Sequence, residues 1–140
     1  MKITLDELRT LIDEPYLSRG NQYFMEGLVE LLSITSTQVK ASAMGTRLYK
    51  VALMREGNFL KGTCSCPAFE DFGPCKHMAA TGFAVMQQAH YTPSRQYTTR
   101  AAHCQSIERT LLKQTKQELV ALILDLANDY PEIIEMLDEE

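Results

Sequence analysis

The stretch of residues 62–80 constrains this chain most, because it holds three of its four cysteines and one of its three histidines. These are Cys64, Cys66, Cys75 and His77, in the spacing C-x-C-x8-C-x-H. A disulfide, a catalytic thiol and a metal site all use such clustering of cysteines. The geometry that the spacing allows helps to choose among them.

The spacing favours a metal site. Side chains two apart on a strand point to one face, so Cys64 and Cys66 can aim at the same point. Positions two apart within a helix do not share a face, so Cys75 and His77 can converge only where a helix begins. The eight residues between the two pairs then form a loop that joins the strand end to the helix start. The outcome is a Cys3His tetrahedron, a standard ligand set for structural zinc.

The charges near the cluster support the same prediction. Orphan N–H groups at a helix N-terminus lower the pKa of thiols, which readies them for metal. Three thiolates and Zn2+ carry a net charge of −1, which Lys61 and Lys76 can offset. Soft sulfur ligands select zinc, copper(I) or iron–sulfur clusters, and a mixed Cys3His set points first to zinc. We therefore predict one structural Zn2+ ion with four protein ligands and no open position.

Two other chemistries fit the cluster less well. A disulfide between Cys64 and Cys66 would be strained, and it needs an oxidising compartment. A catalytic pair of Cys75 and His77 is geometrically awkward and lacks an orienting carboxylate at a recognisable spacing. No other nucleophile or acid–base pair stands out, so we do not expect the chain to be an enzyme.

The remaining cysteine and a second histidine are weaker candidates. Cys104, beside His103, is expected to be a buried small hydrophobe rather than a fifth ligand. His90, thirteen residues after His77, is an outside candidate to replace it as a ligand.

Length and composition indicate an ordinary globular chain. The 140 residues are 45% hydrophobic and 23% charged, which is enough to bury a core. We find no apolar run of about 18 residues and no signal-peptide core, so we expect a cytoplasmic protein without a membrane span. A reducing cytosol also favours metal binding by clustered cysteines over disulfides.

Charge is distributed unevenly along the chain. The net charges of residues 1–35, 36–78, 79–114 and 115–140 are −3, +3, +3 and −7, which together give −4. A basic middle between acidic ends hints at an anionic partner near the cysteine cluster, although ordinary solvated surfaces explain it equally well.

The hydrophobic pattern changes along the chain from a helical period to alternation and back. It predicts an α+β fold with N-terminal helices, an antiparallel β-meander, a helix after the cysteine cluster and C-terminal helices. Residues 1–90 form the zinc-finger domain with its flank, and residues 91–140 form a C-terminal helical segment packed on it. The predicted elements are helices at 3–13 and 15–27, strands at 28–35, 37–44, 47–56 and 58–66, a helix at 75–89, a polar connector at 90–100, and helices at 102–114, 115–129 and 131–140.

The cluster and its flanks resemble the SWIM zinc finger. That family shows C-x-C, a variable loop, then C-x-H opening a helix, and residues 74–80 (PCKHMAA) reproduce its usual sequence at that point. The upstream flank is similar too, with Arg19-Gly20 and Tyr23, Gly27 and Val29, then Gly45-Thr46, Tyr49 and Val51. The resemblance covers about residues 15–90.

The resemblance implies a ββα-type zinc finger that binds DNA or a protein partner such as a helicase-like ATPase. The chain has no phosphate-binding G-x-x-x-x-G-K-[ST] sequence, so it is not itself such an ATPase. The two hypotheses stay open: a nucleic-acid-binding accessory protein, or a protein-interaction adaptor in which zinc is purely structural. In the first, the candidate phosphate contacts are Lys40, Arg47, Lys50, Lys61 and Lys76, with nearby aromatic side chains to stack on bases.

Overall fold

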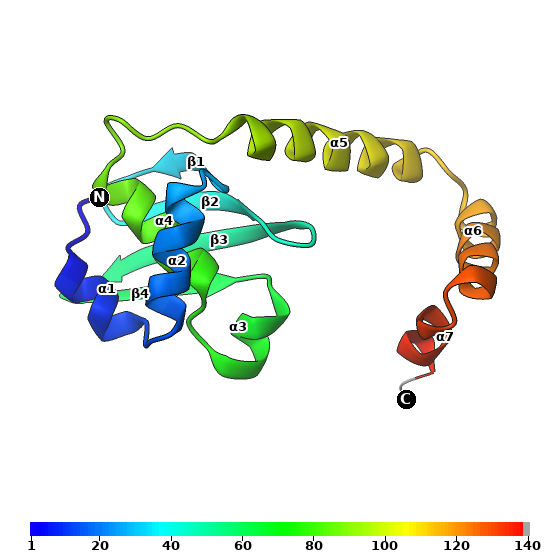
Figure 1. The fold of residues 1–140 in the computed structure, drawn as a ribbon, viewed down its shortest axis with the longest axis horizontal. Helices are drawn as coiled ribbons and strands as arrows, with labels where there is room; N and C mark the ends of the chain where they lie inside the picture. The colour runs from blue at the N-terminus through cyan, green and yellow to red at the C-terminus, as the bar shows by residue number, and fades with distance from the viewer. Residues whose placement is uncertain (139–140) are drawn as a thin grey trace. The chain divides into compact units, whose positions relative to one another are not determined.

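The computed structural model describes residues 1–138, which form seven helices and a four-stranded sheet (Figure 1). It divides into two compact units, unit 1 (Met1–Ala102) and unit 2 (from His103 on). The α+β class predicted from the sequence is confirmed. The elements are α1 Leu5–Leu11, α2 Tyr16–Met25, β1 Val29–Ile34, β2 Gln38–Met44, β3 Leu48–Glu56, β4 Phe59–Cys64, α3 Pro67–Phe72, α4 Lys76–Met86, α5 Arg95–Leu112, α6 Lys116–Asp129 and α7 Glu132–Leu137.

The sheet is an antiparallel meander in which each strand pairs with the next, in the order β1-β2-β3-β4. Alternation in β2 and β3 buries one set of side chains and exposes the other. Because β4 pairs with β3 in the register Val51↔Cys64, the first cysteine of the cluster lies on the buried face. The meander therefore delivers one ligand to the core side of the sheet.

Helix α4 lies over the buried face of the sheet, and α2 packs against α4 (Figure 1). The two helices come unusually close at Gly20, where a Cβ would stand 2.3 Å from the Cβ of Ala79. Helix α1 completes this layer through Leu8, which is fully buried and fills the space above Gly82. This packing fixes where α4 begins, and with it the second half of the cysteine cluster.

The prediction of a polar connector over residues 90–100 is wrong, because α5 already begins at Arg95. The Ser94 hydroxyl accepts a hydrogen bond from the Tyr97 N–H, which satisfies a free donor of the first turn. Tyr97 is buried among Leu28 and Met44, and its hydroxyl donates to Glu30. Burial of Tyr97 therefore gives the first turns of α5 their place in unit 1.

The prediction of an irregular loop between the two ligand pairs is also wrong, because residues 67–72 form the short helix α3. Cys66 is its N-cap, and its sulfur accepts the Phe69 N–H at 3.4 Å. Pro67 occupies the first helical position, where its missing N–H costs nothing. The helix ends at Gly73, whose φ of 84° suits glycine.

Unit 2 consists of the end of α5 followed by α6 and α7. Thr115 and Glu118 form a capping box that starts α6, as the sequence predicts. Of the residues of unit 2 that the structure describes, only Ala127 is buried. Unit 1 ends at Ala102. The division into a domain of residues 1–90 and a helical segment of residues 91–140 packed on it stays a prediction. Across residues 1–138, no helix has both the length and the apolar character to cross a bilayer.

Candidate metal centre

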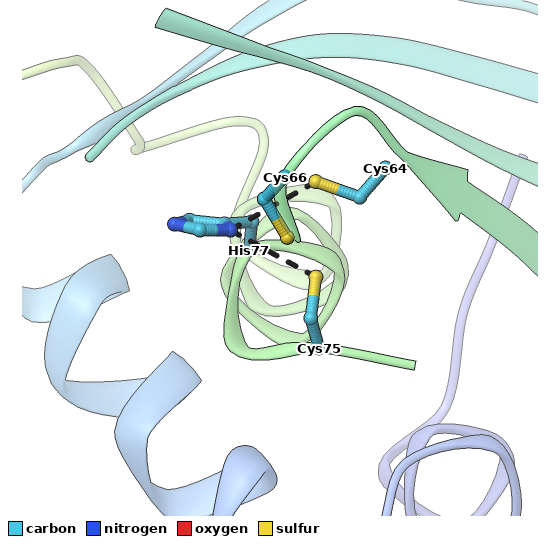
Figure 2. Close-up of side chains that lie close together, drawn as sticks. All are labelled: Cys64, Cys66, Cys75 and His77. Atoms are coloured by element: carbon cyan, nitrogen blue, oxygen red, sulfur yellow. Dashed lines mark hydrogen bonds between the residues drawn. The ribbon is translucent and has the colours of Figure 1, made fainter. Parts of the chain in front are cut away.

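Four side chains converge at the junction of β4, α3 and α4 (Figure 2). Cys64 ends β4, Cys66 caps α3, Cys75 caps α4, and His77 lies in the first turn of α4. One ligand atom from each lies within 4.8 Å of all the others. All four residues are at most 7% exposed. The geometry predicted from the spacing, with Cys75 at the junction and His77 turned back toward it, is what the structure shows.

The separations between donor atoms fit a tetrahedral zinc ion. His77 Nδ1 lies 3.8 Å from both Cys64 Sγ and Cys75 Sγ. A tetrahedral ion with Zn–S of about 2.3 Å and Zn–N of about 2.0 Å separates sulfur from nitrogen by about 3.5 Å. The three thiols and one imidazole nitrogen therefore form a cage that zinc fills, and the donor set is one that zinc prefers.

The second ring nitrogen of His77 supports binding through Nδ1. Nε2 is buried and has no hydrogen-bond partner among the described residues. When Nδ1 binds a metal, Nε2 carries the ring proton. That N–H then lies among aromatic rings: Tyr23 packs edge-on at 5.4 Å between centroids, and Tyr49 lies tilted at 5.0 Å.

The pKa values of the three thiols are shifted in different directions. A hydrogen bond from the Cys64 S–H lowers the pKa of Cys75 to about 4, with further help from His77 and the Met78 N–H. The pKa of Cys64 is raised, chiefly by that same hydrogen bond to Cys75, and burial raises the pKa of Cys66. Of the three thiols, Cys75 is therefore the one favoured as a thiolate, because crowded, buried sulfurs cannot all ionise without a cation between them.

A zinc ion bound by these four side chains would supply that cation. Binding exchanges the thiol protons for a metal ion and removes the repulsion between buried thiolates. With four protein ligands the coordination shell is full, so the ion would tie β4, α3 and α4 together rather than activate water. The Cys3His cluster thus supports the prediction of one structural Zn2+ ion.

Three of the five predicted phosphate contacts share the face of the sheet opposite α2 and α4. Lys40, Lys50 and Lys61 alternate with buried neighbours on β2, β3 and β4, and all three are exposed. Lys40 and Lys50 have no carboxylate within 4.0 Å among residues 1–138, whereas Lys61 pairs with Glu56 at 2.8 Å.

The other two predicted phosphate contacts, Lys76 and Arg47, lie near the metal cluster, each beside a tyrosine that packs on His77. The Lys76 ammonium stands 4.7 Å from the centre of the Tyr23 ring, and the Arg47 guanidinium 5.9 Å from that of Tyr49. The structure adds Arg100, which donates through Nη2 to the carbonyl of Gly45 at 3.0 Å. Sequence reasoning missed Arg100 because it lies within the segment taken for a connector, 55 residues away from its partner.

The weaker candidates lie outside the cluster. Cys104 is half-buried in α5, rather than fully buried as expected, and His90 is exposed after the end of α4. Neither belongs to the group that can hold a metal. The four cysteines, all within the described residues, form no disulfide.

The fold and the ligand set together define a zinc-finger protein. The particular family is given by comparison with known families: the SWIM zinc finger model matches residues 49–81, which run from β3 through the first turns of α4. The chain therefore contains a SWIM zinc finger, and the resemblance seen in the sequence is confirmed over these residues. No curated protein and no solved structure matches the chain.

Proposed function

We propose that this protein is a nucleic-acid-binding accessory module whose zinc ion is purely structural. The observation that carries the proposal is that Lys40 and Lys50, on the exposed face of the sheet, have no salt-bridge partner among residues 1–138. Lys40 lies opposite Ala52 and Lys50 opposite Ser42, so the two ammonium groups are diagonal neighbours on adjacent strands. A phosphate backbone passing over this face can contact both.

The charge of unit 1 supports this assignment. Unit 1 carries 11 basic and 9 acidic side chains, whereas unit 2 carries 3 basic and 9 acidic ones. Eight of the bases of unit 1, against three of its acids, fall between residues 36 and 102. No groove-reading helix is evident, so we expect affinity that depends on salt but little on base sequence.

The experiment is a fluorescence-anisotropy titration of labelled single-stranded and duplex 20-mers with the zinc-loaded protein at 50, 100 and 200 mM salt. We expect affinity to fall as salt rises, and Lys40→Gln/Lys50→Gln to reduce the slope of log K against log salt by about two. The matched control is Lys113→Gln/Lys116→Gln, which removes the same charge from unit 2. Affinity that does not change with salt, or equal effects of both double variants, would contradict the proposal.

A second candidate function is a protein-interaction adaptor, which the exposed apolar side chains of unit 2 favour. Its partner, for which a helicase-like ATPase is one candidate, would present a basic, apolar surface, because α6 and α7 combine exposed leucines and isoleucines with an excess of acids. The test is binding of a basic amphipathic model peptide, which Leu124→Asp should abolish. Binding of an acidic analogue of equal hydrophobicity would count against it.

Neither candidate function requires catalysis. Four protein ligands leave zinc without an open position, so we assign the protein no enzymatic activity of its own. We place it in the cytoplasm, where a reducing environment keeps three thiols available for the metal.

A further inference from the structure

A hollow of about 430 Å³ opens on the surface of unit 1 directly beside the metal cluster. Its wall is formed by α2, by β3 and the loop before it, by the starts of α3 and α4, and by the early turns of α5. Two of the four metal ligands belong to this lining. The lining residues are Tyr23, Gly45, Thr46, Tyr49, Cys66, Pro67, Ala68, Lys76, His77 and Arg100.

All the formal charge in the lining of this hollow is positive. Lys76 and Arg100 are its two formally charged side chains, and no acid belongs to the lining. Within residues 1–138, neither cation has a carboxylate within 4.0 Å. Lys76 instead rests over the Tyr23 ring, and Arg100 gives one of its five N–H donors to the Gly45 carbonyl. Both groups therefore keep hydrogen-bond donors for a ligand.

Two hydroxyl groups add a neutral donor to the same wall. Thr46 Oγ1 and the Tyr49 hydroxyl lie 2.8 Å apart, so one donates to the other and one hydroxyl hydrogen stays available. Gly45 permits this arrangement, because a Cβ there would stand 2.4 Å from the Tyr49 ring. Gly45 thus leaves room for the tyrosine ring, and the hydrogen bond with Thr46 holds its hydroxyl in place.

We propose that this hollow binds a phosphate group, carried by the backbone or by the 5′ end of the nucleic acid assigned under the proposed function. A guanidinium fork, an ammonium and a hydroxyl around one hollow match the several acceptor oxygens of phosphate. The two cations exceed the single negative charge of a Cys3His zinc centre beside them. This inference rests on the proposed function only for the identity of the molecule that carries the phosphate.

The first test needs no nucleic acid. The zinc-loaded protein, labelled with 15N, is titrated with inorganic phosphate at constant ionic strength. We expect saturable shifts at the Thr46 and Lys76 amides and at the Arg100 side chain, with at least tenfold weaker binding in Arg100→Gln. The control is Arg95→Gln, an exposed arginine on the same helix outside the hollow, which should stay within twofold. Zinc content shows that both variants keep the fold; equal shifts with acetate, or in Arg100→Gln, would overturn the proposal.

The second test separates the two sources of phosphate. Arg100→Gln and Arg95→Gln are titrated with a 12-mer that carries a 5′-phosphate and with one that lacks it. If Arg100→Gln weakens binding of both 12-mers and lowers the salt slope by about one, the hollow binds a backbone phosphate. If Arg100→Gln weakens binding of the 5′-phosphorylated 12-mer only, the hollow binds a terminal phosphate. If the wild-type protein binds the 12-mers and Arg100→Gln binds them equally well, the hollow is not the phosphate site, but the proposed function still stands. If the wild-type protein binds inorganic phosphate but neither 12-mer, the proposed function is wrong and the phosphate site in the hollow still stands.

Discussion

Units 1 and 2 are both rich in apolar residues, but they use them in opposite ways. Unit 1 wholly or partly buries most of its leucines, valines and aromatic rings in its core. Of the sixteen large apolar side chains that the described residues expose, eleven belong to unit 2. Hydrophobic content alone therefore does not make a core, which also needs a second layer to pack against.

The interactions that stabilise the fold also differ between the two units. Unit 1 combines a packed core with a metal site that pins three elements at one point. Unit 2 depends on local helix signals such as the Thr115 capping box. Changes to packing or metal should therefore act on unit 1, and changes to helix ends should act on unit 2.

The largest effect is expected from Cys75→Ala. Loss of this ligand should abolish tight zinc binding, which contributes on the order of 10 kcal/mol of folding free energy in small zinc modules. Amide protection should disappear across residues 64–80 and stay unchanged in α6. Metal analysis together with hydrogen exchange measures both. Wild-type zinc stoichiometry with native protection over residues 64–80 would show that the metal is not what orders this region.

A matched pair of leucine truncations tests the difference in burial. Leu8 is 0% exposed and Leu124 is 62% exposed. Leu8→Ala should lower the free energy of unfolding of unit 1 by about 2–5 kcal/mol, because it leaves a cavity. Leu124→Ala should change stability by less than about 0.5 kcal/mol. Urea unfolding of the two variants measures this; a large loss in Leu124→Ala would mean that unit 2 buries this face against a partner.

Much of unit 1 could be predicted from the sequence because its signals are local. Alternation gave the four strands, and the cysteine spacing gave the ligand geometry. The start of α5 was missed although Ser94 is an ordinary N-cap residue, because the surrounding polar residues resemble a connector. Helix α3 was missed because its cap is a cysteine, which is not among the usual capping residues. The hollow beside the metal could not be predicted, since it depends on Arg100 meeting a loop far away in the chain.

Removal of the α6 cap should have a smaller effect, confined to unit 2. In Thr115→Ala the Glu118 N–H loses its acceptor, which should destabilise α6 by about 1 kcal/mol. Faster hydrogen exchange in the first turn of α6, with no change in zinc affinity, is the expected result. Thr115→Ser, which keeps the hydroxyl, is the control. A change in zinc affinity would contradict the independence of the two units.

The smallest effect concerns the ion pair between Glu7 and Arg55, which joins α1 to β3. The Arg55 guanidinium lowers the pKa of Glu7 from 4.5 to about 2. Because the folded-state pKa is lower, the contribution of the pair is complete above pH 4.5 and is lost as pH falls toward 2. Both side chains are partly exposed, so solvent screening should keep the contribution of this ion pair small.

The stability difference between the wild-type protein and Glu7→Gln, measured by urea unfolding from pH 6 downward, reports this contribution. It should shrink as the pH falls below 4.5, while loss of zinc affects both proteins alike. A difference that stays constant with pH would assign the effect of the variant to the capping box of α1 instead.

The meander also sets the order in which the molecule assembles. Every strand pairs with its neighbour in the chain across a short turn, so the sheet closes no long loops and should form early. The four ligands span only residues 64–77, beginning at the end of β4, the last strand of that sheet. We expect the newly made chain to reach a nearly finished scaffold before any metal arrives, so that zinc capture is a late, reversible step limited by the supply of the ion.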